Sequence, residues 1–301
     1  MTVRTLNKGA VGPELQYIEP KEGKMPIHTR LILLLIALLM SFPGWTQADN
    51  NTVYIFSAPP RETMQVGKDK YEPIAKYLSA VIGKKVVYKH PGNWGIYRSR
   101  MVKGRYDIVF DGPHFNGYRA IKMRHNIVAK ISTIHEFVVI VKKSNTTYKN
   151  LGQMGGRTFC THAPPNLGTL TLLQEFENPS RQPFIVNTKG WNKIYNGVQS
   201  GRCVAGILPI LNLQKLDPKL KFSRIIFHAK KMPNQAFSVG PRISKKDQLK
   251  IARALVAPNS AEPTNKLRMA YNVKGNFVPT SNKEYFHMAK YLKNEWGYYL
   301  P

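Results

Sequence analysis

His114 stands beside a loop that could bind an anion. The loop breaks a predicted strand at Tyr106–Phe110 through Gly112 and Pro113, and proline suits the first position of a helix because its φ is fixed and it lacks an N–H group. A helix start offers unpaired backbone N–H groups and the positive end of the helix dipole, which favour a negative charge. A protonated His114 would add a positive charge, whereas a neutral one would bond to the backbone. Both alternatives stay open.

A second loop of the same layout follows later in the chain. A predicted strand at Arg157–Cys160 leads into the turn Thr161–Asn166, which contains His162, and a helix opens at Leu167. Two such helix starts facing one another would form one clamp at the carboxyl ends of the strands, where open α/β sheets bind ligands. Any α/β protein contains loops of this kind, so neither loop alone defines a site.

Motifs for catalysis or metal binding are missing from the sequence. It has no GxSxG, HExxH, P-loop or GxGxxG pattern, and its eight histidines show no metal-ligand spacing. We therefore expect a protein that is not an enzyme, with no catalytic residues, no metal and no cofactor. An exported hydrolase of phosphorylated compounds is the alternative, which turnover of a phosphate ester would support.

The first residues predict export. An apolar run at Leu31–Met40 follows a basic stretch and precedes small residues up to Ala48, as in a secretory signal peptide, and it is too short to span a membrane. We exclude residues 1–48 from the folded protein and expect a soluble periplasmic product, since no cysteine near the cleavage point offers a lipid anchor. Met25 stands where a signal peptide should begin, so a misassigned start is an alternative reading of the first 24 residues.

Export also bears on the two cysteines and on the charge. Cys160 and Cys203 predict a single disulfide in an oxidising compartment, and two buried unpaired thiols are the alternative.

The net charge of +28, from 45 Lys and Arg against 17 Asp and Glu, would attract anions, nucleic acid or an anionic membrane surface. Export argues against nucleic acid, and a basic surface with no specific role is equally compatible with the sequence.

Alternating strands and helices must position these loops. Predicted strands at 53–56, 86–88 and 106–110 alternate with one helix that ends at Gly83 and another that Asn93 caps, and the same order repeats in the second half. This alternation predicts an α/β protein with mostly parallel sheets flanked by helices.

Two tryptophans mark the repeat. Trp94 precedes Gly104 by ten residues and Trp191 precedes Gly201 by ten, and each glycine is followed by an arginine and a strand. The shared spacing predicts two lobes of like construction, with a tryptophan at a helix start on the carboxyl side of each sheet. The alternative is that both tryptophans anchor their helices in the core.

The predicted lobes divide the chain unevenly. Lobe 1 takes residues 52–138 and 243–301, and lobe 2 takes residues 139–242. The chain would cross between them twice, near 139 and 242, which forms a hinge. Helices near 261–271 and 282–296 are expected to close the chain.

Several motifs together resemble the periplasmic phosphate, phosphite and phosphonate-binding proteins of ABC transporters. They are Pro59–Glu62, Trp94–Asp107, Gly112–Phe115 and His162–Thr169. The resemblance implies a two-lobed type II solute-binding fold, in which loop hydroxyls, helix-start amides and aromatic side chains hold a small oxyanion. It implies delivery to an inner-membrane permease by a protein that we expect to be a monomer. The alternative function is ligand sensing for a membrane receptor kinase or cyclase.

Two departures from the family pattern concern the ligand. Relatives carry a Ser-Thr-Ser run that contacts the phosphoryl oxygens, and this chain has roughly Pro165, Asn166 and Leu167 there. Only Gly168 and the Thr169 hydroxyl of that pattern remain to bind the ligand. Aminophosphonate binders carry an acid after the strand that ends here at Leu208, whereas this chain continues with Pro209. We therefore expect an anion without an amino group.

The predicted ligand-binding residues come from both lobes. They are Pro60, Arg61, Trp94, Tyr97, Gly112, Pro113, His114, Phe115, His162, Asn166, Gly168, Thr169 and Trp191.

Overall fold

The computed structural model describes residues 52–295 and 297–300. The predicted signal peptide, its cleavage after Ala48 and the alternative start at Met25 lie outside these residues. Within them, no helix combines the length and the apolar character that crossing a membrane requires.

The first of two sheets has six strands in the order β11-β4-β10-β3-β1-β2. Strands β1, β2 and β3 are parallel, while β10 runs antiparallel to both β3 and β4. The strand bounds are β1 Tyr54–Ser57, β2 Val86–Tyr88, β3 Ile108–Asp111, β4 Asn126–Lys130, β10 Ala236–Val239 and β11 Val278–Pro279.

The second sheet has five strands in the order β7-β6-β8-β5-β9. Strand β6 is parallel to β7 and β8, and β5 runs antiparallel to β8 and β9. The strand bounds are β5 Phe137–Lys142, β6 Thr158–Thr161, β7 Phe184–Asn187, β8 Ala205–Pro209 and β9 Ser223–His228.

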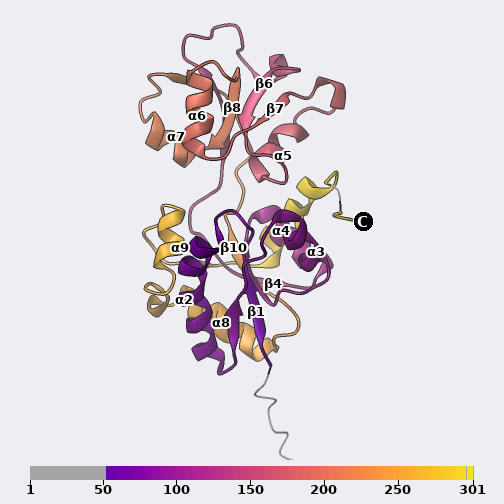
Figure 1. Ribbon diagram of the computed structural model, residues 1–301, viewed down its shortest axis with the longest axis vertical. Helices are drawn as coiled ribbons and strands as arrows, with labels where there is room; N and C mark the ends of the chain where they lie inside the picture. Colours follow the sequence, from indigo (N-terminus) through magenta and orange to yellow (C-terminus); the bar gives the residue numbers. More distant parts are fainter. Residues whose placement is uncertain (1–51, 296, 301) are drawn as a thin grey trace, which may run out of the picture. The chain divides into compact units, whose positions relative to one another are not determined.

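Most strands of each sheet run in one direction, as predicted: β1, β2, β3 and β4 in the first sheet, and β6, β7, β8 and β9 in the second. The antiparallel members include β5 and β10, the strands that follow the two segments connecting the sheets (Figure 1). Alternating patterns locate strands but do not give the direction of a strand that arrives from the other sheet. The chain changes sheet between β4 and β5 and again between β9 and β10.

Helix bounds follow the capping and spacing signals in the sequence. In α2, Tyr71, Ile74, Ala75 and Leu78 are buried at helical spacing, and Gly83 ends the helix with a φ of 67°. The helix bounds are α2 Met64–Ile82, α3 Trp94–Val102, α4 Pro113–Lys122, α5 Leu167–Gln174, α6 Trp191–Gln199, α7 Ile210–Leu216, α8 Lys245–Val256 and α9 Asn265–Ala270.

The C-terminal part differs from the prediction. Instead of one helix over 282–296, it forms two 3₁₀ segments, η4 at Asn282–Glu284 and η5 at Phe286–Leu292. Segment η5 packs closely on α4, where a side-chain carbon at Gly117 would lie 2.7 Å from the backbone nitrogen of Ala289. No local sequence pattern predicts this contact, because the two segments are far apart in the sequence. Helix α7 and strand β11 were likewise not predicted.

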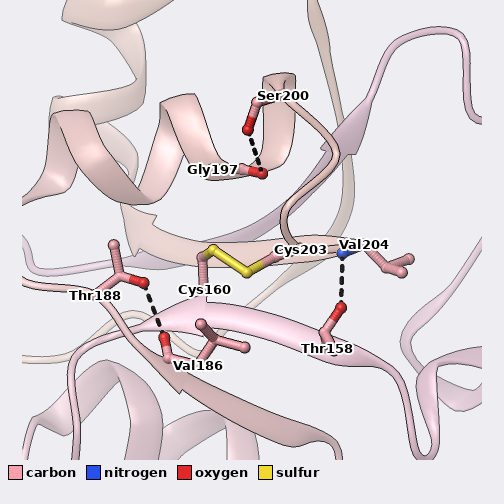
Figure 2. Close-up of a disulfide and its surroundings, with 8 residues drawn as sticks. All are labelled: Thr158, Cys160, Val186, Thr188, Gly197, Ser200, Cys203 and Val204. Atoms are coloured by element: carbon pink, nitrogen blue, oxygen red, sulfur yellow. Dashed lines mark hydrogen bonds between the residues drawn. A yellow bond between two sulfur atoms is a disulfide. The ribbon is translucent and has the colours of Figure 1, made fainter.

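A disulfide ties the second sheet together, as predicted. Cys160 lies in β6 and Cys203 just before β8, with their Cα atoms 5.6 Å apart and both side chains buried (Figure 2). Helix α6 passes directly over the bridge, since a side-chain carbon at Gly197 would lie 2.6 Å from the Cys160 sulfur. The disulfide therefore fixes a strand, a loop and a helix of the second lobe.

Candidate functional site

A cavity of about 820 Å³ is lined by loops that leave both sheets. Four helices begin at its wall, at Trp94, Pro113, Leu167 and Trp191. They follow β2, β3, β6 and β7, so each lobe contributes two helix starts at the carboxyl ends of parallel strands. None of these four helices has an acidic residue in its first turn. The wall is therefore built from helix ends that favour an anion.

Arg61 places a cation at this wall and is held by Asp111. Its Nη2 lies 3.2 Å from Asp111 Oδ1, its Nη1 donates to the Tyr271 hydroxyl at 3.0 Å, and its side chain is 30% exposed. Asp111 is fully buried and also pairs with buried Arg119 at 2.9 Å. Two guanidinium groups against one carboxylate leave a positive charge, and Arg61 is the member that reaches the cavity.

Tyr97 lies behind this cluster rather than in the cavity. Its hydroxyl donates to Asp111 and accepts from Arg119, and its side chain is fully buried. Burial raises the pKa of Tyr97 well above its usual value, so the phenol stays neutral. The structure thus assigns Tyr97 to the support of the arginine cluster, not to the cavity wall where the sequence placed it.

His114 joins the two predicted halves of the clamp. Its Nε2 donates to the carbonyl of Pro165 at 3.0 Å, which connects the start of α4 to the turn before α5. Burial lowers the pKa of His114 to about 4, so the ring is neutral at physiological pH. Of the two alternatives, the structure has the neutral histidine bonded to backbone.

Aromatic side chains from both lobes complete the wall. Trp94 stacks on Phe115 with ring centroids 6.1 Å apart, and Trp191 meets His162 edge to face at 4.5 Å. All four residues line the cavity, and the two tryptophans are half-buried. Burial lowers the pKa of His162, which makes it a neutral polar group rather than a cation.

The turn before α5 does not present the expected hydroxyl. Thr169 is fully buried, and its Oγ1 donates to the His162 carbonyl and shares a hydrogen bond of 2.8 Å with Thr161. Gly168 packs against Phe137, whose ring a side-chain carbon at Gly168 would approach to 2.7 Å. Neither Gly168 nor Thr169 lines the cavity.

Ten predicted residues meet at the cavity wall. They are Pro60, Arg61, Trp94, Gly112, Pro113, His114, Phe115, His162, Asn166 and Trp191. Over the ranges that the structure describes, no group of three or more His, Cys, Asp or Glu side chains is arranged to hold a metal ion.

Sequence reasoning included Glu62 in the Pro59–Glu62 motif but missed Glu136 and Lys189 at the wall. Glu62 lines the cavity and pairs with Lys70 at 2.5 Å, and Glu136 lines it and pairs with His228 at 2.7 Å. Lys189, just before Trp191, also lines the cavity, and its closeness to that helix start was the available signal. Glu136 reaches the wall through the antiparallel pairing of β5 with β8, which no local pattern reports.

A two-lobed fold with a cavity between helix starts defines a binding protein. The family described as ABC transporter, phosphonate, periplasmic substrate-binding protein matches residues 56–285. The chain belongs to this family, whose members bind substrates and are not enzymes. Membership implies a small-molecule ligand, a membrane permease as partner and a periplasmic location. Among curated proteins, none matches the sequence.

Solved structures support the fold. PhnD1 from Prochlorococcus marinus, in complex with methylphosphonate, is 15% identical with a TM-score of 0.61 over 80% of this chain and 97% of its own. A Xanthomonas citri protein bound to ATP is 11% identical with a TM-score of 0.63 over 80% and 97%. A binding protein component of an ABC phosphonate transporter from Pseudomonas aeruginosa is 14% identical with a TM-score of 0.56 over 79% and 85%.

Proposed function

We propose that this protein captures a small phosphonate-like oxyanion, such as an alkylphosphonate, phosphite or phosphate, and delivers it to an inner-membrane ABC permease. One observation carries the proposal. Four helices begin at the cavity wall with no acid in any of their first turns, so backbone N–H groups and four dipoles favour negative charge at one place.

Charge around the cavity supports the same ligand class. Arg61 presents a guanidinium whose fork of N–H groups suits tetrahedral oxyanions. The net charge of +28 adds a long-range field that draws anions toward the protein. The methylphosphonate complex of the Prochlorococcus marinus relative supports an alkylphosphonate as the first ligand to test.

The route to the periplasm and the oligomeric state belong to the proposal. The protein is exported through the signal peptide within residues 1–48 and acts as a monomer. N-terminal sequencing of protein recovered from periplasm should begin near Asp49, and light scattering should give one chain per particle.

Thermal denaturation with methylphosphonate, phosphite and phosphate tests the ligand class. A ligand at 100 times its dissociation constant should stabilise the protein by about 2.7 kcal/mol. Titration calorimetry then gives the order of affinities. If none of the three raises the melting temperature or releases heat, the proposed ligand class is wrong. Loss of phosphonate uptake on deletion of the gene would support transport.

A further inference from the structure

One ring nitrogen of His114 has no partner although it is buried. The side chain is 2% exposed, Nε2 donates to Pro165, and Nδ1 contacts no hydrogen-bonding group among the described residues. Because Nε2 carries the proton of the neutral ring, Nδ1 can only accept a hydrogen bond. A buried acceptor without a donor is uncommon in folded proteins, and one at a ligand cavity points to a group that the ligand supplies.

Gly112 lies against both the His114 ring and the Arg61 guanidinium. A side-chain carbon on Gly112 would lie 3.1 Å from His114 Nδ1 and 3.5 Å from Arg61 Nη2. A ligand oxygen that approaches Gly112 from this side therefore meets an acceptor on one flank and a cationic donor on the other. Both contacts lie at the start of α4, where the amides of His114 and Phe115 have no partner within the helix.

Gln235 carries a second buried acceptor. Ala236 pairs with Asp111 across the antiparallel strands β10 and β3, and Gln235 and Gly112 are the residues adjacent to this pair in the chain. The Oε1 atom of Gln235 is buried and has no hydrogen-bond partner in the described part of the chain. Both residues line the cavity. An anion with no hydrogen to donate would satisfy neither acceptor.

We propose that the site over Gly112 takes a protonated oxygen, and that the protein thereby selects oxyanions in their singly protonated form. This inference rests on the proposed function. The P–OH group donates to His114 Nδ1, and the unprotonated oxygens face Arg61 and the helix-start amides. Phosphonates, phosphite and phosphate can carry such a proton near neutral pH. Sulfonates cannot, so they are discriminated against despite their similar shape.

The groups that face His114 keep the proton on the ligand. Asp111 from β3 favours a charged ring, whereas Arg61 from the loop after β1 and Arg119 from α4 oppose it. The Pro165 carbonyl from the second lobe already holds the Nε2 proton. Burial lowers the pKa of His114 by more than any one of these groups raises or lowers it.

Methylphosphonate and methanesulfonate form a matched pair for the test. We expect titration calorimetry to show at least tenfold tighter binding of methylphosphonate at pH 6.5. Its affinity should fall as the pH rises through its second ionisation, whereas methanesulfonate binding should not follow that ionisation. Equal affinities, or proton uptake with methanesulfonate in buffers of different ionisation enthalpy, would overturn the proposal.

Two variants of His114 separate the ring nitrogens. His114→Asn keeps an acceptor near the position of Nδ1, and His114→Gln keeps a donor near the position of Nε2 for the Pro165 carbonyl. The preference for methylphosphonate should persist in His114→Asn and fall by about the same factor of ten in His114→Gln. The comparison in the unmodified protein decides the question even if a variant fails to fold. If methylphosphonate, phosphite and phosphate all fail to bind, the proposed function itself is wrong.

Discussion

Arg61 and Asp111 lie 3.2 Å apart, with Arg61 in the loop after β1 and at the cavity wall, and Asp111 at the end of the neighbouring parallel strand β3. The carboxylate is fully buried, while the guanidinium remains partly exposed to the cavity. Asp111 thus fixes the orientation of Arg61. The three side chains together keep a positive charge, because buried Arg119 also pairs with Asp111. The pair prepares a cationic group for a ligand before one arrives.

Replacing Arg61 by glutamine should weaken anion binding. A hydrogen bond to a charged group contributes about 1.5 to 3 kcal/mol, so the dissociation constant for methylphosphonate should rise roughly 10- to 150-fold. Lys103→Gln is the matched control, since it removes one positive charge at an exposed position away from the cavity wall. Equal effects of the two variants would show that only net charge matters.

Replacing Thr169 by valine should affect stability rather than affinity. Its hydroxyl bonds to Thr161 and to the His162 carbonyl, so the variant leaves buried groups unpaired at a cost of about 1 to 3 kcal/mol. Urea unfolding measures that loss, and calorimetry should give a dissociation constant within about twofold of the unmodified protein. Weaker binding at unchanged stability would return Thr169 to the ligand.

Local signals in the sequence found most of the elements, and most of the predicted ligand-binding residues lie at the cavity wall. Asn93 caps α3, Pro113 opens α4, and Trp94 and Trp191 both begin helices, because capping and spacing act within a few residues. The bonds of the Thr169 hydroxyl to the chain could not be predicted, because a hydroxyl near a turn gives no sign of whether it faces a ligand or the chain. Glu136 was missed because its position depends on pairing across a sheet.

Gly197 should tolerate no larger residue. The methyl group of Gly197→Ala would lie 2.6 Å from the Cys160 sulfur, and overpacking of this kind costs about 1 to 3 kcal/mol. Gly95→Ala is the matched control in helix α3, where the added carbon meets nothing closer than 3.4 Å. Chemical unfolding should show a loss only for Gly197→Ala, and equal stabilities would mean that α6 can shift away from the disulfide.

Acid should destabilise the protein through its buried histidines. Burial lowers the pKa of His114 to about 4 and that of His125 to about 3, below the usual value of 6.5 that the unfolded chain keeps. The unfolded state therefore binds more protons between pH 6.5 and 4, and stability falls as the pH falls through this window. Each residue should account for about 2 kcal/mol between pH 6.5 and 4.5. Urea unfolding at several pH values measures the slope, which His125→Gln should reduce.

An amino group on the ligand should bring no gain in affinity. A buried ammonium needs a carboxylate or several acceptors, because an unpaired buried cation is very costly. The position after Leu208 is taken by Pro209, and the two glutamates at the wall already have partners, Lys70 for Glu62 and His228 for Glu136.

Competition calorimetry with aminoethylphosphonate and methylphosphonate checks this expectation. We expect methylphosphonate to bind at least as tightly, and Glu136→Gln to leave the ratio of the two affinities unchanged. Glu136 is the residue to vary because its partner His228 is largely exposed and can move away from it. Aminoethylphosphonate binding tenfold more tightly, about 1.4 kcal/mol, with that advantage lost in Glu136→Gln, would instead identify Glu136, just before β5, as the residue that binds the ammonium group.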